Sequence, residues 1–205
     1  MQGYIISLNR VKDEDLIVTI LAKGTLHTLY RFYGARHGTI NMGFKLDYEI
    51  EPSAKSTIGR LKDVIHLGFT WIHDNERLHL WQNFVSLFYM HLKDAEDLGT
   101  FYFDLLEDAS KTWHKQNPKR VAVESYIKLL KHEGRLHKEL RCFLCSHPIS
   151  ENISLIRAYL PTHFECTHTL EINRAGLVEL FNKNSTLFLS DKEVERLWTI
   201  LLEGL

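Results

Sequence analysis

Residues 4–33 of the 205-residue chain read YIISLNRVKDEDLIVTILAKGTLHTLYRFY. The first five of these residues follow a period of two, and the runs 16–22 and 26–33 are rich in β-branched and aromatic side chains. A period of two is typical of a strand that buries one face. The segment therefore predicts three consecutive strands joined by short turns.

Two more runs extend this pattern along the chain. Residues 46–50 alternate apolar and polar side chains, and residues 64–71 are again rich in apolar and aromatic types. Gly24, Gly34 and Pro52 stand between the runs, where turns are expected. Because five short strands in about seventy residues are typical of a small barrel, we predict a five-stranded OB-type β-barrel.

Helical periodicity replaces the strand pattern after Asn75. Apolar residues then recur at spacings of three and four, as they do on one face of a helix. The first such set is Leu78, Trp81, Val85, Phe88 and Leu92. A second helix is predicted over residues 98–113, and a third begins at the Asn117-Pro118 pair, a good N-cap and first-turn combination.

A capping box over residues 190–193 predicts one more helix near the C-terminus. Strands followed by helices indicate an α+β fold. We therefore expect an OB-fold, nucleic-acid-binding barrel domain at residues 1–75 and an α-helical domain at residues 76–205.

The bulk composition is that of an ordinary soluble globular protein, with 44% hydrophobic and 25% charged residues. No apolar run reaches the length of a membrane span, and the first residues lack the pattern of a secretory signal. These features predict a cytoplasmic protein that does not enter the membrane. The formal net charge of -1 argues against a highly basic DNA-coating protein, whose affinity would come from many phosphate contacts.

Charge is nevertheless segregated along the chain. Between Leu16 and Leu46 there is no carboxylate, and residues 111–141 hold nine Lys and Arg against three Asp and Glu. The basic candidates for phosphate contacts are Lys23, Arg31, Arg36, His37, Lys45, Lys119 and Arg120. We expect an electropositive face near the first block, which the second block could continue. The alternative is an ordinary solvated surface whose acids come from elsewhere in the fold.

Aromatic residues are interleaved with these cations. On a strand, Tyr30 and Phe32 share one face while Arg31 and Tyr33 share the other. Aromatic rings can stack on bases while arginines follow the phosphates. We predict that Arg31 and Tyr33 point outward, and the alternative role for the aromatic rings is core packing.

Three cysteines are too few for a disulfide scaffold, but their spacing indicates a metal site. Cys142 and Cys145 have the two-residue gap that lets backbone amides wrap a pair of metal-bound sulfurs, and Cys166 follows with histidines nearby. The fourth ligand could be His163, His168 or His147. We choose His163 because His163 and Cys166 repeat the two-residue gap.

The site would be a structural zinc site, because four protein ligands leave no open coordination position. It would define a small zinc module at about residues 139–170, inserted in the helical domain. The alternative interpretations are inert buried thiols or a redox pair, and a redox pair favours a βαβ setting that the sequence does not predict.

No pattern typical of an enzyme is present. The segment from Gly38 to Lys45 is similar to a phosphate-binding loop, but its lysine stands one place too late and Leu46 replaces the hydroxyl residue that would hold magnesium. We therefore predict a protein that is not an enzyme. A catalytic set drawn from distant parts of the chain is the alternative.

Three segments together resemble the N-terminal signature of RecO, the bacterial recombination mediator. They are Tyr4-Ile-Ile-Ser-Leu8, Glu14-Asp-Leu-Ile-Val-Thr19 and Tyr33-Gly-Ala-Arg36. Helices after the barrel and a late pair of cysteines followed by a second ligand pair also match the order found in this family. Members typically have two CxxC pairs, and here His163 stands in place of the first cysteine of the second pair.

The resemblance implies a role in DNA repair and recombination without catalysis. It implies binding to single- and double-stranded DNA, annealing of complementary strands, and help in loading RecA onto strands coated by single-strand-binding protein. Expected partners are RecR and the C-terminal tail of that protein, with RecA acting indirectly, and the expected location is the nucleoid. The competing hypothesis is a zinc-stabilised protein-interaction adaptor that binds DNA little or not at all.

Overall fold

The computed structural model describes residues 1–36, 38–54, 56–95, 97–150 and 152–205. These residues form two compact units, residues 1–114 and residues 115–205, each with its own core. Residues 76–114 share the first unit with the barrel. The predicted division into a barrel domain at residues 1–75 and a helical domain at residues 76–205 stays a prediction.

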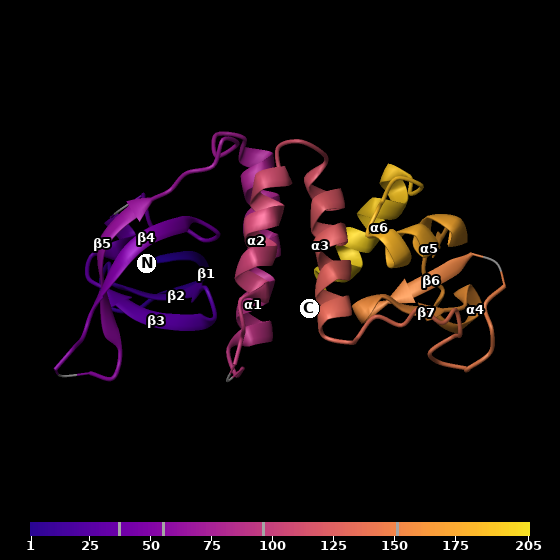
Figure 1. Cartoon of the computed structure of the whole chain (residues 1–205), viewed down its shortest axis with the longest axis horizontal. Coiled ribbons are helices and arrows are strands. Elements are labelled where there is room, and N and C mark those ends of the chain that lie inside the picture. Colours follow the sequence, from indigo (N-terminus) through magenta and orange to yellow (C-terminus); the bar gives the residue numbers. More distant parts are fainter. Residues whose placement is uncertain (37, 55, 96, 151) are drawn as a thin grey trace. The chain divides into compact units, whose positions relative to one another are not determined.

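Five strands of the first unit close into a barrel with the order β1-β2-β3-β5-β4 (Figure 1). The strands are β1 (Gln2–Arg10), β2 (Leu16–Ala22), β3 (Thr25–Arg31), β4 (Lys45–Glu51) and β5 (Gly59–His66). All pairings are antiparallel except the one between β3 and β5, which joins only Leu29 to Gly59 and Tyr30 to Arg60. This closed five-stranded barrel, followed by helices, confirms the predicted fold class.

The barrel interior is filled from every strand. Its core contains Ile5, Val18, Ile20, Leu29, Leu46, Tyr48 and Leu61, together with Ile40 and Phe44 from the loop before β4. The alternation in β4 marks the buried face, as the sequence predicts, since Leu46 and Tyr48 are buried while Asp47 and Glu49 are not. Between β3 and β4 the chain also makes the short 3₁₀-helix η1 (Gly34–Arg36).

Strand β1 departs from a simple alternation because it is buried on both faces. Ile5 belongs to the barrel core, while its neighbours Tyr4 and Ile6 are also fully buried. Helix α1 (Asn75–Leu92) packs against β1, and α2 (Phe101–Thr112) contributes Phe103 to the surroundings of the Tyr4 ring.

An aromatic cluster joins the barrel to these two helices. Its rings are Tyr4, Phe69, Trp71, Trp81, Phe84, Phe103 and Trp113, with neighbouring centroids 4.4 to 6.5 Å apart. Each buried indole N–H donates to a backbone carbonyl: Trp71 to Ser110 at 3.1 Å and Trp81 to Gly43 at 2.8 Å, with Trp113 bound to the carbonyl of Arg77. The cluster thus buries large rings and leaves no indole N–H unpaired, which burial would otherwise penalise.

The second unit is built on helices with a small sheet between them. Its elements are α3 (Pro118–His132), β6 (Ile153–Ile156), the 3₁₀-helix η2 (Arg157–Tyr159), β7 (Leu160–Thr162), α4 (Phe164–Thr167), β8 (Glu171–Ile172), α5 (Arg174–Lys183) and α6 (Asp191–Leu201). The sheet has the order β7-β6-β8, and α3 packs against α6 and α5. Asn117 caps α3 and the Ser190–Glu193 capping box begins α6, which confirms both predicted helix starts.

In the described part of the chain, every helix is too short or too polar to cross a membrane.

The aromatic cluster predicts the cost of removing its central ring. Trp81 is fully buried, so Trp81→Ala should lower the free energy of unfolding by about 3–5 kcal/mol. Urea unfolding followed by circular dichroism measures this loss. Met90→Ala, an exposed position on the same helix, is the matched control and should stay within about 0.5 kcal/mol of the parent. A loss below about 1 kcal/mol for Trp81→Ala would contradict the central place of the cluster.

Candidate functional site

The four predicted metal ligands come together in the second unit. Cys142 and Cys145 lie in a turn that follows an isolated bridge between Arg141 and Pro148, while His163 precedes α4 and Cys166 lies within it. The Sγ atoms and the imidazole nitrogen all lie within 4.8 Å of one another. The two ligand pairs therefore meet although about twenty residues separate them along the chain.

The orientation of His163 is that of a metal ligand. Its Nε2 lies 3.1 Å from the carbonyl oxygen of Pro148, and since a carbonyl only accepts, Nε2 carries the proton and donates. Its Nδ1 is then free of hydrogen in the neutral ring and lies 3.3 Å from Sγ of Cys145. Metal-binding histidines usually donate their second ring N–H to an oxygen in this way, which fixes the ring and its tautomer.

The other two histidines lie outside the cluster. His168 ends α4 in the left-handed conformation, with a φ of 53°, and its ring contacts Phe164. His147 is exposed, and its backbone oxygen accepts a hydrogen bond from the amide of Cys142. Among the three candidates that the sequence offered, His163 is thus the one that the fold brings to the cysteines.

The electrostatics of the cluster favour a bound cation. Burial would raise the pKa of Cys142, but hydrogen bonds from the backbone amides of Cys145, His163 and Leu144 lower it to about 6. Partial desolvation and the neighbouring sulfurs raise the pKa of Cys166 to about 11, because two thiolates side by side repel each other. A hydrogen bond to the Pro148 carbonyl raises the pKa of His163. A divalent cation at the centre would remove the repulsion between the thiolates.

The spacing also fits zinc. Tetrahedral zinc with bonds of about 2.3 Å to sulfur and about 2.0 Å to nitrogen places these ligand atoms about 3.5–3.8 Å apart. Here the four ligand atoms lie within 4.8 Å of one another, and Nδ1 of His163 lies 3.3 Å from Sγ of Cys145. The residues present could therefore hold a metal ion, and the three-sulfur, one-nitrogen donor set is one that zinc prefers.

A second group of functional candidates lies on the barrel, just past the end of β3. Phe32 and Tyr33 are 48% and 57% exposed. The guanidinium of Arg60 lies over the Phe32 ring at 5.3 Å, and that of Arg36 lies over the Tyr33 ring at 5.1 Å. We call these four residues the aromatic–arginine surface; its two rings are exposed, and its two guanidinium groups are ion-paired, Arg36 with Glu14 and Arg60 with Glu51 at 3.5 Å.

Asp15 holds the backbone of this surface in place. Its carboxylate accepts from the Tyr30 hydroxyl at 2.5 Å and from the Tyr33 amide at 2.7 Å, and these two hydrogen bonds lower the pKa of Asp15. Tyr33 itself has a φ of 50°, a backbone conformation that residues other than glycine rarely adopt. The backbone that carries the exposed rings is therefore held by the hydrogen bonds to Asp15.

The predicted pairing of Arg31 with Tyr33 on one outward face holds only for Tyr33. Arg31 is half-buried: its guanidinium donates to the carbonyl of Leu61 at 2.8 Å, and its Nε is buried with no hydrogen-bond partner in the described part of the chain. Because β3 ends at Arg31, the alternation ends there too, and Phe32 turns to solvent together with Tyr33.

Several predicted DNA-contacting cations are paired with carboxylates. Arg36 forms an ion pair with Glu14, and Lys45 forms one with Glu107 at 2.5 Å, where its side chain is only 17% exposed. Lys23 is exposed in the turn after β2 and makes no ion pair with any described residue. His37 lies outside the described residues. Whether any of these residues contacts DNA stays a prediction.

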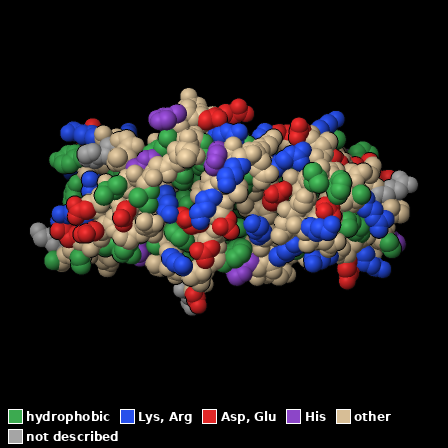
Figure 2. Space-filling view, turned by 45° about the horizontal axis from the view of Figure 1, so that its top comes forward, with side chains coloured by type: hydrophobic (Ala, Val, Ile, Leu, Met, Phe, Trp, Pro, Cys, Tyr) green, Lys and Arg blue, Asp and Glu red, His purple; other side chains and the backbone are tan. Residues whose placement is uncertain are grey.

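The two cations predicted at the start of α3 also have partners. Lys119 pairs with Glu195 of α6. Arg120 pairs with Asp191 at 2.7 Å and donates to the carbonyls of Thr186 and Leu189, so it braces the loop between α5 and α6. On the face drawn in Figure 2, acidic and basic side chains are likewise interspersed.

Sequence reasoning missed Arg60. This residue reaches the aromatic–arginine surface through the parallel pairing of Tyr30 with Arg60, which joins strands about thirty residues apart. No local signal marks such a pairing, because a pattern of period two identifies strands but not their neighbours.

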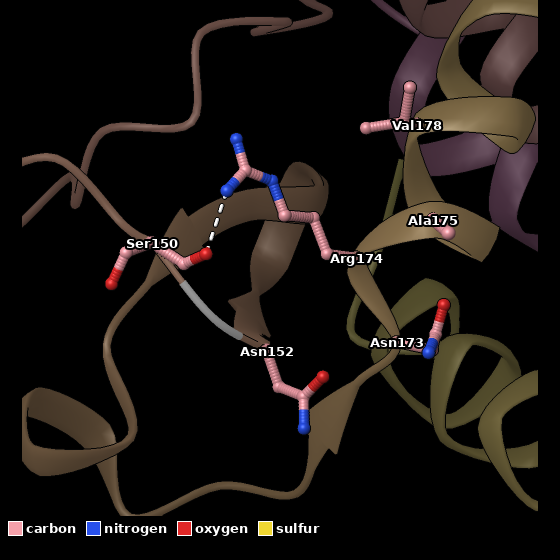
Figure 3. A pocket seen from close by; sticks show the side chains of 6 residues that line it. All are labelled: Ser150, Asn152, Asn173, Arg174, Ala175 and Val178. Carbon is pink, nitrogen blue, oxygen red and sulfur yellow. Dashed lines mark hydrogen bonds between the residues drawn. The ribbon is translucent and has the colours of Figure 1, made fainter.

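Two pockets lie in the second unit. One, of about 530 Å³, is lined by Ser150, Asn152, Asn173, Arg174, Ala175 and Val178 (Figure 3). Arg174 donates to the carbonyl of Ser150 at 2.7 Å, and no carboxylate, histidine or thiol is among these lining residues. The other, of about 350 Å³, lies beside Cys142 and is lined partly by His137, Glu139 and Arg141.

The metal cluster leads to a prediction about His163. Protein purified without a histidine tag should contain about one equivalent of zinc, and His163→Ala should lose most of it because the closed four-ligand set is broken. Metal analysis by mass spectrometry measures both. His168→Ala is the matched control and should retain zinc. Equal zinc contents in the two variants would contradict the choice of His163.

The comparison with known families adds to this geometry. Residues 1–72 match the family model described as RecO N terminal. A search among curated proteins found no match to the chain. The matched segment contains all five barrel strands and the aromatic–arginine surface. Residues 1–72 are therefore similar to a RecO N-terminal domain, and this match supports a RecO-like protein.

Proposed function

We propose that the chain is a recombination mediator that binds DNA and performs no catalysis. In this proposal it binds single- and double-stranded DNA, anneals complementary strands and helps load RecA onto strands coated by single-strand-binding protein. Its protein partners would be RecR and the C-terminal tail of single-strand-binding protein. The observation that carries the proposal is the match of residues 1–72 to RecO N terminal, which supports a RecO-like role in DNA repair.

The aromatic–arginine surface is the part of the barrel best suited to a single strand. Exposed rings such as Phe32 and Tyr33 offer flat faces on which unpaired bases can stack, and stacking accepts any base. Arg60 and Arg36 already lie beside these rings, so their charges are placed where a backbone phosphate would follow a stacked base. The surface therefore combines the two contacts that sequence-independent binding needs.

The ion pair between Arg36 and Glu14 sets the affinity of this surface. Both side chains are well exposed, and an exposed pair contributes little stability. A phosphate can therefore replace Glu14 at low cost, although the carboxylate competes with it. This competition offers a way to raise affinity as well as to lower it.

The metal cluster has a structural role in the proposal. Cys142, Cys145, His163 and Cys166 would hold zinc, which would cross-link the turn at residues 142–145 to α4. Because α4 has only four residues and none of them is buried, this cross-link would add to the hydrogen bond between the hydroxyls of Thr167 and Thr162 in attaching α4 to the module.

A different observation favours the adaptor hypothesis as a second candidate. The turns that carry the metal ligands expose apolar side chains, with Phe143 at 57% and Leu144 at 55%, and three of the predicted DNA-contacting cations outside the aromatic–arginine surface are ion-paired. Oligonucleotide affinity across a salt series separates the two functions, because phosphate contacts impose a steep loss of affinity with salt.

Removing both exposed rings tests the strand-binding surface. Phe32→Ala with Tyr33→Ala should weaken binding to a single-stranded oligonucleotide at least about five-fold for each ring, since base stacking contributes about 1–3 kcal/mol. Fluorescence anisotropy measures the affinity. Leu187→Ala, which removes an exposed side chain in the second unit, is the control. Unchanged affinity in a folded double variant would exclude this surface.

Removing the competing carboxylate should have the opposite effect. Glu14→Gln leaves Arg36 without its acidic partner, so affinity for a single strand should rise and the dependence of binding on salt should become steeper by about 0.7 per added phosphate contact. The same anisotropy titration at several salt concentrations measures both. Glu49→Gln, an exposed carboxylate on β4, is the control. A weaker affinity in Glu14→Gln would contradict the competition.

The mediator activity itself is tested by annealing. Complementary oligonucleotides coated with single-strand-binding protein should anneal faster with the chain than without it. A chain that binds the coating protein but does not bind DNA and does not speed annealing would favour the adaptor hypothesis.

A further inference from the structure

The three cysteines of the metal cluster differ in their access to solvent. Cys142 is 2% exposed, whereas Cys145 and Cys166 are exposed. Cys142 is also surrounded by its own turn: its amide donates to His147, and its carbonyl accepts from Ser146. A reagent in solution therefore reaches two of the three sulfurs.

The two exposed sulfurs are also neighbours. Cys145 and Cys166 belong to the set whose ligand atoms all lie within 4.8 Å of one another, and they come from different segments, the 142–145 turn and α4. Because α4 is short and carries no buried residue, a small movement of its backbone can bring the two sulfurs to bonding distance. Cys142 is held in its turn by hydrogen bonds and has less freedom to move.

We propose that Cys145 and Cys166 form a peroxide-sensitive pair whose oxidation to a disulfide releases the metal. This inference rests on the proposed metal site. The oxidant is a hydroperoxide. The Cys145 thiolate attacks its distal oxygen, so an S–O bond forms and the O–O bond breaks, and the alkoxide or hydroxide leaves and takes up a proton.

The second step closes the disulfide. The Cys166 thiolate attacks the sulfenic sulfur, an S–S bond forms, the S–O bond breaks and hydroxide leaves as water after protonation. The two thiolates supply the two electrons that reduce the hydroperoxide. The metal then retains only Cys142 and His163 as ligands and departs, because two ligands do not make a closed site.

The structural change would be local to α4. The hairpin of β6 and β7 has its own support, since the Thr162 hydroxyl donates to the carbonyl of Ser154 and Ile153 and Leu155 are fully buried. Oxidation would therefore replace the metal cross-link between the 142–145 turn and α4 with the Cys145–Cys166 disulfide and would release Cys142 and His163, while the sheet and helices stay folded.

The test treats the zinc-loaded full chain with hydrogen peroxide. Zinc release is followed with a chromophoric chelator, remaining thiols are alkylated, and peptides are mapped by mass spectrometry. About one equivalent of zinc should be released, a Cys145–Cys166 disulfide should form, and Cys142 should be the alkylated cysteine. Dithiothreitol with added zinc should reverse the change.

Two variants make the assignment specific. Cys142→Ser should still form the Cys145–Cys166 disulfide. In Cys145→Ser, no disulfide should form as fast as in the parent. Far-UV circular dichroism shows whether each variant is folded. Retention of zinc with three intact thiols, a disulfide that contains Cys142, or only disulfides between chains would each overturn the proposal. If the chain takes up no zinc, the metal assignment fails, while the peptide map still decides whether the pair forms.

Discussion

Burial of β1 on both faces is the constraint on which the first unit depends. Ile5 faces the barrel core while Tyr4 faces the aromatic cluster, so a single strand belongs to two cores. The Tyr4 hydroxyl donates to Glu107 of α2 at 2.7 Å, and the same carboxylate pairs with Lys45 of β4. One half-buried carboxylate thus joins two strands to a helix, in the same unit that contains residues 76–114 and the barrel.

Local patterns predicted much of this architecture. Alternating and β-branched runs marked β1 to β4, whereas the run predicted at residues 64–71 overlaps only the end of β5. The Asn117-Pro118 pair and the 190–193 capping box marked helix starts, and the repeated two-residue gap singled out His163. Long-range pairing was beyond such patterns. The short strands β6, β7 and β8 are too brief for a periodic signal, and the approach of Arg60 to Phe32 depends on a pairing between distant strands.

Charge was the least predictable property, for a physical reason. The segment between Leu16 and Leu46 contains no carboxylate, yet folding brings Glu14 to Arg36 and Glu107 to Lys45. A partly buried cation such as Lys45 needs an opposite charge because desolvation is costly, and the fold supplies that charge from a remote helix. Counts of charge along a chain therefore overstate the free cationic surface, since even the exposed Arg36 and Arg60 beside the aromatic rings have carboxylate partners, Glu14 and Glu51.

The seam where β3 meets β5 is the shortest junction in the barrel, with two residue pairs. At this junction Tyr30 pairs with Arg60, and Tyr30 also contacts Phe32 while Arg60 lies over it. A molecule that binds Phe32 and Arg60 would contact the chain on both sides of the β3–β5 junction. Ligand binding and closure of the barrel would then be thermodynamically linked, so that a bound ligand would raise the free energy needed to open the β3–β5 junction.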